Sequence, residues 1–369
     1  MAKRLPVTVI TGFLGAGKTT VLRHLLTRGG QRLAVMVNEF GSVGLDGDLI
    51  RSCGFCPEEE VDGRLVELNN GCLCCTVQDD FLPTMETLLE RADQLDGIVV
   101  ETSGLALPRP LLQALDWPAI RSRVHVNGVV TLVDGEALAA GSPVADAEAL
   151  ERQRAEDPSL DHLTAIDDLF EDQLQAADLV LISRADCLDA SAMAEVQGRI
   201  KDKVRPGTAL LPVSQGQVET SVVLGLEHKS TPQEAHDHHD HDHHDHDHHD
   251  HSHVDMVGSI VRVEGALDRQ ALEQLLPSLV SNLQVVRLKG RVWLPSKTLP
   301  LQIQMVGPRL NSWFEAAPSH AWRPDQGCGA DLVVLALNEA AAPALESGLQ
   351  RLVQATPAKA SPAAATPES

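Results

Sequence analysis

Short apolar runs alternate with amphipathic stretches from residue 5 to about residue 223. The runs are rich in Val, Ile and Leu, as expected of strands buried inside a sheet. We expect strands at Val7–Ile10, Leu33–Val37, Leu65–Leu68, Gly97–Val100, Gly128–Val133, Leu179–Ile182 and Ala209–Pro212. Helical patterns lie between most of them, notably at Asp79–Ala92, Asp161–Ala176 and Ala190–Lys201. This alternation predicts an α/β fold with a mostly parallel sheet that is covered on both faces.

The pattern changes twice in the second half of the chain. Periodicity disappears from about Gly225 to Asp255, where a His and Asp repeat predicts a disordered linker. A small α+β domain follows, with a helix at Asp268–Leu276 and strands at Ser259–Val263, Gln284–Leu288, Val292–Leu294, Leu301–Met305 and Leu332–Leu337. After Glu339 the chain is rich in Ala, Pro and Ser, so a frayed tail is expected. The predicted organisation is a domain over 1–224, a linker over 225–255, a second domain over 256–340 and a tail over 341–369.

Composition and charge narrow the partners and the compartment. The 369 residues carry a formal net charge of −22, which argues against a nucleic acid or an anionic membrane as partner. No apolar run reaches the roughly 18 residues of a membrane-spanning helix, and none precedes the first strand as a signal peptide would. Seven Cys in such a chain indicate free thiols in a reducing cytoplasm. We therefore expect a cytoplasmic protein.

The residues after the first strand fit the pattern of a phosphate-binding loop. Gly12 to Thr19 match G-x-x-x-x-G-K-[ST], in which glycines let the backbone wrap an anion with its N–H groups pointing inward. Lys18 supplies a cation for the phosphates, the Thr19 hydroxyl suits Mg²⁺, and the following helix points its positive end at the anion. The bland alternative is a glycine-rich turn with a chance Gly-Lys-Thr, against which the flanking strand and helix argue. The predicted nucleotide contacts here are Gly12, Gly15, Ala16, Gly17, Lys18, Thr19 and Thr20.

Another apolar strand ends in an acid that suits the same nucleotide. Glu101 ends the run Gly97-Ile-Val-Val-Glu101 and is followed by Gly104. This order suits Glu101 near Mg²⁺ and the Gly104 N–H near the γ-phosphate. Many strands end in Glu, so the motif gains its weight from the phosphate loop that precedes it. Lys18 and Glu101 are the predicted catalytic residues.

A later strand end carries residues that suit a guanine base. Ser183, Arg184 and Asp186 stand where a P-loop GTPase carries its N-K-x-D motif. The Asp carboxylate can accept two hydrogen bonds that guanine offers and adenine does not, and Arg184 can cover the base with its stem and planar head. Ser183 is a departure, because a hydroxyl cannot repeat the hydrogen bonds of an amide. The alternative is that Asp186 or Ser183 simply caps the next helix.

Three clustered thiols form the second distinctive stretch. Cys72 and Cys74 are two residues apart, so in an extended chain their side chains lie on one side, about 7 Å apart along the backbone. Cys75 precedes an expected helix, whose dipole favours the thiolate. Three thiolates suit Zn²⁺, and also Co²⁺ or Cu⁺. The alternative is a set of buried apolar cysteines.

The other cysteines carry weaker signals. Cys53 and Cys56 form a C-x-x-C pair, which is ambiguous between a metal site, a redox pair and chance. Cys187 and Cys328 are isolated and are expected to be structural.

A run of imidazoles lies inside the predicted linker. Eleven His alternate with six Asp between His236 and His253. Neutral imidazoles ligate metals, and the Asp residues add attraction for cations, so a disordered run offers many weak sites. The alternative is a solvated linker that binds metal only incidentally. The candidate ligands are His236, His238, His239, His241, His243, His244, His246, His248, His249, His251 and His253.

Together these motifs resemble the CobW family of metal-linked P-loop GTPases. The resemblance rests on Thr11-Gly-Phe-Leu-Gly-Ala-Gly-Lys-Thr-Thr20, Asn38-Glu-Phe-Gly41, Gly44-Leu-Asp46, Asn70-Gly-Cys-Leu-Cys-Cys75, Glu101-Thr-Ser-Gly104, Arg287-Leu-Lys-Gly290 and the His-rich run. It implies a G domain related to the nickel-handling GTPases of hydrogenase and urease assembly, and a CobW C-terminal domain. It also implies a role in supplying metal, with cobalt for cobalamin synthesis as the expected cargo and zinc or iron as alternatives.

The resulting prediction is a metallochaperone whose thiolate site is assembled by Mg²⁺–GTP and released on hydrolysis. Glu39 and Asp46 are possible ligands of Mg²⁺ or of water in a nucleotide-ordered segment. A client metalloprotein such as a cobalt chelatase and a nucleotide-dependent homodimer are the expected protein partners. No catalytic Gln or Arg stands out, so slow intrinsic turnover is expected. The alternatives are a P-loop kinase acting on a small acceptor and a metal store based on the His run.

Overall fold

The computed structural model describes residues 4–28, 30–37, 65–67, 81–146, 148, 150–151, 166–225, 256–319 and 321–355. The chain forms two compact units. The first comprises Met1–Asp255 with Val306–Arg309, and the second comprises Met256–Met305 with Leu310–Ser369.

A seven-stranded sheet forms the centre of the first unit, with the strand order β3-β2-β4-β1-β5-β6-β7. Every pair of neighbouring strands in it is parallel. The strands are β1 (Leu5–Thr11), β2 (Leu33–Val37), β3 (Leu65–Glu67), β4 (Gly97–Glu101), β5 (Val124–Asp134), β6 (Leu179–Ser183) and β7 (Ala209–Pro212). Each contains one of the predicted strands or overlaps it, so the α/β prediction is confirmed.

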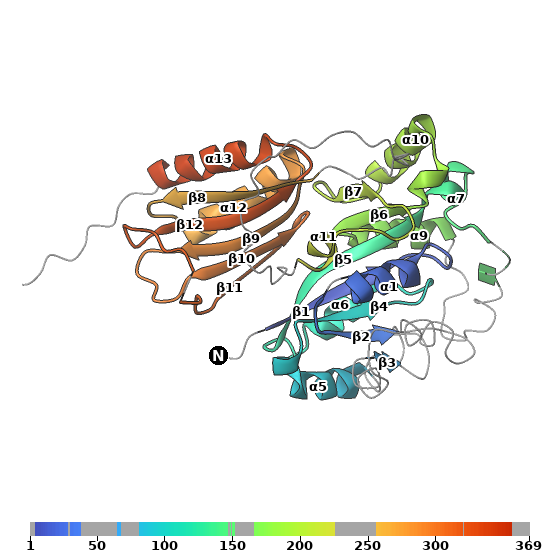
Figure 1. Cartoon of the computed structure of the whole chain (residues 1–369), viewed down its shortest axis with the longest axis horizontal. Coiled ribbons are helices and arrows are strands. Elements are labelled where there is room, and N and C mark those ends of the chain that lie inside the picture. Colours follow the sequence, from blue (N-terminus) through green and yellow to red (C-terminus); the bar gives the residue numbers. More distant parts are fainter. Residues whose placement is uncertain are drawn as a thin grey trace, which may run out of the picture. The chain divides into compact units, whose positions relative to one another are not determined.

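Helices connect these strands and pack against the sheet (Figure 1). They are α1 (Lys18–Arg28), α5 (Leu82–Glu90), α6 (Pro108–Leu115), α7 (Gly135–Ala139), α9 (Ile166–Ala176), α10 (Ala190–Lys201) and α11 (Thr220–Leu224). Helix α10 has the predicted bounds, whereas the short helices α6, α7 and α11 were not predicted. In the part of the chain described above, no helix is long and apolar enough to span a bilayer.

The parallel arrangement brings the carboxyl ends of the strands to one edge of the sheet. Ile10 of β1 is in register with Glu101 of β4, and Asp134 of β5 is in register with Ser183 of β6. Loops that leave these strand ends therefore lie side by side. Ligands bind at this edge in open parallel sheets.

The second unit is a five-stranded sheet with two helices, as the α+β prediction expected. Its strand order is β11-β10-β9-β12-β8, and β12 pairs antiparallel with both β8 and β9. The elements are β8 (Val257–Glu264), α12 (Arg269–Asn282), β9 (Val285–Trp293), β10 (Leu301–Val306), β11 (Arg309–Phe314), β12 (Gly329–Ala336) and α13 (Ala341–Ala355). One continuous strand, β9, replaces two predicted strands, and β11 was not predicted.

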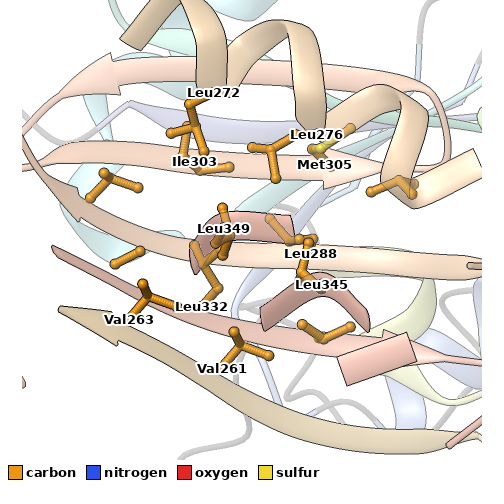
Figure 2. Close-up of a cluster of buried hydrophobic side chains, with 14 of the residues drawn as sticks. Val261, Val263, Leu272, Leu276, Leu288, Ile303, Met305, Leu332, Leu345 and Leu349 are labelled. Atoms are coloured by element: carbon orange, nitrogen blue, oxygen red, sulfur yellow. The ribbon is translucent and has the colours of Figure 1, made fainter. Parts of the chain in front are cut away.

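Helix α13 corrects the expectation that the chain frays after Glu339. Ala341, Leu345 and Leu349 repeat every four residues and are at most 1% exposed, so they form one apolar stripe. Figure 2 shows Leu345 and Leu349 among the buried side chains of the sheet, with Leu272 and Leu276 of α12 in the same core. The Ala-rich composition that predicted a tail instead supports a helix, because Ala has the highest helix propensity.

Candidate nucleotide-binding site

The loop between β1 and α1 has the backbone that a phosphate-binding loop needs. Gly12, Gly15 and Gly17 have φ values of 136°, 79° and 95°, which residues with a side chain rarely adopt. At Gly12 a Cβ would also lie only 2.3 Å from the carbonyl oxygen of Leu132. Helix α1 begins at Lys18, directly after the third of these glycines, so its free N–H groups open towards the loop.

Lys18 is held inside this loop. Its side chain is 8% exposed, and Nζ donates hydrogen bonds to the carbonyl oxygens of Gly12 at 2.9 Å and Phe13 at 3.1 Å. The ammonium group is thus placed at the mouth of the glycine-rich turn. Thr19 is half-buried and Thr20 is exposed in the first turn of α1. This arrangement places a cation, a hydroxyl and a helix N-terminus together, as binding of a magnesium-bound phosphate requires.

The end of β4 contacts the same loop. Glu101 is the last residue of β4 and is 3% exposed. The next residue, Thr102, donates from its backbone N to the Ile10 carbonyl oxygen and from Oγ1 to Thr11 Oγ1, both at 2.9 Å. A Cβ on Gly104 would lie 2.6 Å from the Leu14 backbone N. Glu101 and Gly104, which were predicted to lie near Mg²⁺ and the γ-phosphate, therefore lie directly beside the phosphate loop.

Gln173 supports the loop after β4 and was missed by the sequence analysis. It lies on α9, is fully buried, and donates from Nε2 to the Gly104 carbonyl oxygen at 3.0 Å. The backbone carbonyl oxygen of Gln173 accepts a hydrogen bond from Thr131 Oγ1 at 3.3 Å. The available signal was a polar residue on the apolar stripe of a helix, between Phe170 and Leu174. A side chain in that place must satisfy a buried polar group.

The predicted base-reading residues lie beside the phosphate loop as well. A Cβ on Gly17 would be 3.7 Å from Ser183 Cβ, in ordinary van der Waals contact. Ser183 Oγ donates to the Val133 carbonyl oxygen at 3.2 Å, so it ties β6 to β5. Arg184 has a left-handed backbone with φ of 53°. Asp186 is exposed on a single 3-10 turn, Ala185–Cys187, where its carboxylate is accessible to a ligand.

A fourth loop lies against the first turn of α1. After β7, Gln215 has φ of 52° and Gly216 has φ of 72°. A Cβ on Gly216 would lie 2.8 Å from Thr20 Cγ2 and 3.0 Å from the Thr20 carbonyl carbon. This turn was not predicted to have a role, although its Ser-Gln-Gly sequence after a strand indicates a tight turn. Loops from β1, β4, β6 and β7 therefore meet at one place.

The predicted transition-metal ligands lie outside the described residues. This applies to Cys72, Cys74 and Cys75, to Glu39 and Asp46, to Cys53 and Cys56, and to the His236–His253 run. Within the described ranges, no three His, Cys, Asp or Glu side chains come together as a metal site.

Two cysteines can be placed, and both are free thiols. Cys187 is exposed and Cys328 is half-buried. Desolvation, together with the nearby Asp186 and Glu136 carboxylates, raises the pKa of Cys187 above its ordinary value. Desolvation also raises the pKa of Cys328. Both are therefore protonated at neutral pH and are poor candidates for thiolate ligands.

The sequence matches known protein families over both units. Residues 6–212 match the nucleotide-binding domain of the CobW/HypB/UreG family, and residues 256–353 match the cobalamin synthesis protein CobW C-terminal domain. A zinc chaperone CobW from Pseudomonas aeruginosa is 45% identical over 339 residues, which cover 90% of this chain and 87% of that protein. A zinc chaperone CobW from a Sinorhizobium species is 40% identical over 365 residues, which cover 95% of this chain and 98% of that protein. Among solved structures, Zn(II)-bound YjiA GTPase from E. coli is similar, with 19% identity and a TM-score of 0.38. The match covers 95% of this chain and 99% of that chain.

Proposed function

Because the chain belongs to the CobW/HypB/UreG family, we propose that it is a zinc chaperone that releases its metal when GTP is hydrolysed. Membership of this family makes it a GTPase metallochaperone that uses GTP, Mg²⁺ and a divalent transition metal. The observation that carries the GTP-dependent part of the proposal is the buried Lys18 ammonium, held by the glycine turn that Gly104 approaches closely, with Gly216 against Thr20 of α1. The proposal adds a cargo, a ligand set and a coupling between metal and nucleotide.

Zinc replaces cobalt as the proposed cargo. Two relatives that match most of the chain are zinc chaperones. Nitrogen and sulfur ligands also bind Zn²⁺ more tightly than Co²⁺ in the usual affinity order. We assign the zinc ligands to Cys72, Cys74 and Cys75, because three nearby thiolates suit a tetrahedral ion. Cobalt would then reach the site only where the supply of metals in the cell favours it.

Nucleotide and metal are coupled in this proposal. If Mg²⁺–GTP raises the affinity of the thiolates for Zn²⁺, Zn²⁺ must raise the affinity for GTP by the same factor. Couplings of this kind are typically about 5- to 150-fold. Hydrolysis would remove that gain and favour transfer of zinc to a client metalloprotein. A nucleotide-dependent homodimer is one way to raise a slow intrinsic turnover.

The test is a calorimetric titration of Zn²⁺ into the full chain with Mg²⁺ and either a non-hydrolysable GTP analogue or GDP. We expect one tight site whose affinity is at least about fivefold higher with the GTP analogue. Cys72→Ser with Cys74→Ser should remove that site and leave unchanged the affinity for the GTP analogue measured without Zn²⁺. Cys328→Ser is the matched control, since Cys328 is a free thiol of the second unit outside the cluster. Equal zinc affinities in the two nucleotide states would overturn the coupling, and tight binding by the double variant would overturn the ligand set.

A further inference from the structure

Asp134 joins two loops at the carboxyl edge of the first sheet. It is the last residue of β5 and is 2% exposed. Its Oδ1 accepts a hydrogen bond from the Ala137 backbone N at 3.1 Å, which caps α7. Its Oδ2 accepts a hydrogen bond from Arg184 Nη1 at 2.6 Å. A buried carboxylate is stable only with such partners, so Asp134 fixes where the guanidinium lies.

The backbone around Arg184 is held as firmly as its side chain. Its φ of 53° lies in the left-handed region, which is unfavourable for a residue with a side chain. The carbonyl oxygen of Arg184 accepts from Cys187 N at 3.0 Å, and Ala185 N donates to the Val213 carbonyl oxygen at 3.3 Å. An unfavourable backbone of this kind persists only where its surroundings determine it, and it is often found at ligand sites. These contacts constrain the turn that carries Asp186.

We propose that Asp134 is a positioning residue for guanine recognition. It holds Arg184, and with it the turn that carries Asp186, in the arrangement that selects guanine over adenine. This inference rests on the proposed function, in which Arg184 and Asp186 read the base of GTP. Ser183 cannot supply the hydrogen bonds of an amide, because its Oγ is engaged with the Val133 carbonyl oxygen. In this proposal the ion pair of Asp134 with Arg184 holds the base-reading residues in place instead.

The chemistry of the pair explains why it can orient a base-covering side chain. A guanidinium is planar, and one short hydrogen bond to a buried carboxylate anchors one end of the group. Arg184 is 43% exposed along its side chain, so most of its other donors and its flat face stay available. Ordering the side chain before the ligand arrives removes an entropy cost from binding.

A second carboxylate near Arg184 provides a matched control. Glu136 Oε2 lies 3.7 Å from the same Nη1 atom, but the Glu136 side chain is 59% exposed. Exposed ion pairs contribute little, whereas a buried charge that loses its partner is strongly disfavoured. Replacement of Glu136 therefore removes a similar charge from the same guanidinium without disturbing its orientation.

The test is a calorimetric comparison of non-hydrolysable GTP and ATP analogues with Mg²⁺ and the full chain. Asp134→Asn keeps an oxygen for the α7 cap and removes the charge that holds Arg184. We expect it to weaken binding of the GTP analogue about tenfold and to leave the ATP analogue unchanged. Arg184→Gln should have the same effect, and the double variant should be no weaker than either single variant, because both lose one interaction. Glu136→Gln should stay within about twofold of the wild type.

The outcomes separate this inference from the proposed function. Suppose that the wild type prefers the GTP analogue. If both single variants keep that preference, or if their losses of preference add up in the double variant, the role of Asp134 is overturned and the proposed function stands. A wild type without preference for the GTP analogue overturns both base reading and the role of Asp134. Circular dichroism shows whether each variant is folded. If Asp134→Asn is not folded, Asp134→Ser takes its place, because Ser keeps a capping oxygen for α7 and removes the charge.

Discussion

At the scale of single residues, Gly104 is the position where added volume has the most direct effect on the site. A Cβ there would lie 2.6 Å from the Leu14 backbone N and 3.2 Å from the Phe13 carbonyl carbon. These are backbone atoms of the phosphate loop, so they can yield only if the loop moves. We expect Gly104→Ala to lower kcat/KM for GTP at least about tenfold, a loss of about 1.4 kcal/mol, measured as release of inorganic phosphate.

Gly198→Ala is the control for this change. Gly198 is exposed on α10, and a Cβ there meets no atom within 4 Å. We expect unchanged hydrolysis and a gain of about 0.5–1 kcal/mol in unfolding free energy, because Ala loses less backbone entropy than Gly. Full activity of Gly104→Ala would show that the contact with the phosphate loop is irrelevant to turnover.

Residues of the site differ in how far the sequence could predict them. Gly12 and Lys18 act within one loop, and their spacing alone gave their arrangement. Gln173 and Asp134 act through partners that lie 69 and 50 positions away along the chain. No local pattern marks such a pair, because only the folded sheet brings its members together. The sequence showed at most that Gln173 interrupts an apolar stripe.

At the scale of elements, we expect Gly→Ala at two positions of the second sheet to change the unfolding free energy in different ways. A Cβ on Gly290 of β9 would lie 2.0 Å from the Asp331 carbonyl oxygen of the neighbouring strand β12. Gly290→Ala must therefore push the strands apart, and we expect a loss of about 1–3 kcal/mol in unfolding free energy. Gly258 lies on the edge strand β8, and a Cβ there meets no atom within 4 Å.

The matched change Gly258→Ala should be neutral or slightly stabilising, because glycine weakens a strand interior. Denaturant titration followed by circular dichroism measures both variants against the wild type. Equal stabilities of the two variants would mean that the close approach at Gly290 does not constrain the sheet.

Helices and strands could be predicted where apolar residues follow one clear pattern along the chain. The strands of the first sheet are short apolar runs between turns, so their positions followed from composition alone. Helix α13 was missed because Ala and Pro suggested disorder, although Ala341, Leu345 and Leu349 already showed a helical spacing. Strand β11 was missed because Arg309–Phe314 mixes polar and apolar residues, and all six are half-buried. Half-buried edge elements carry the weakest pattern.

At the scale of the whole molecule, the His236–His253 run tests whether the chain stores metal or delivers it. The run contains eleven His and six Asp but offers no fixed set of ligands by its sequence. We expect its deletion to reduce the number of Zn²⁺ bound at saturation and to leave one tight, GTP-dependent site, because the ligands proposed for that site are thiolates outside the run. Equilibrium dialysis with metal analysis measures both quantities. Loss of the tight site on deletion would favour a store.

The distribution of aromatic residues gives the intact chain a built-in optical label. It has four Trp and no Tyr, and only Trp117 lies in the first unit, where it packs beside the apolar core. Trp293 and Trp322 of the second unit meet edge to face, with ring centroids 5.7 Å apart. Ultraviolet emission therefore reports mainly on the second unit, and replacing Trp117 by Phe would leave that unit as the sole emitter. Thermal unfolding of the second unit can then be followed by Trp fluorescence without a signal from the first unit.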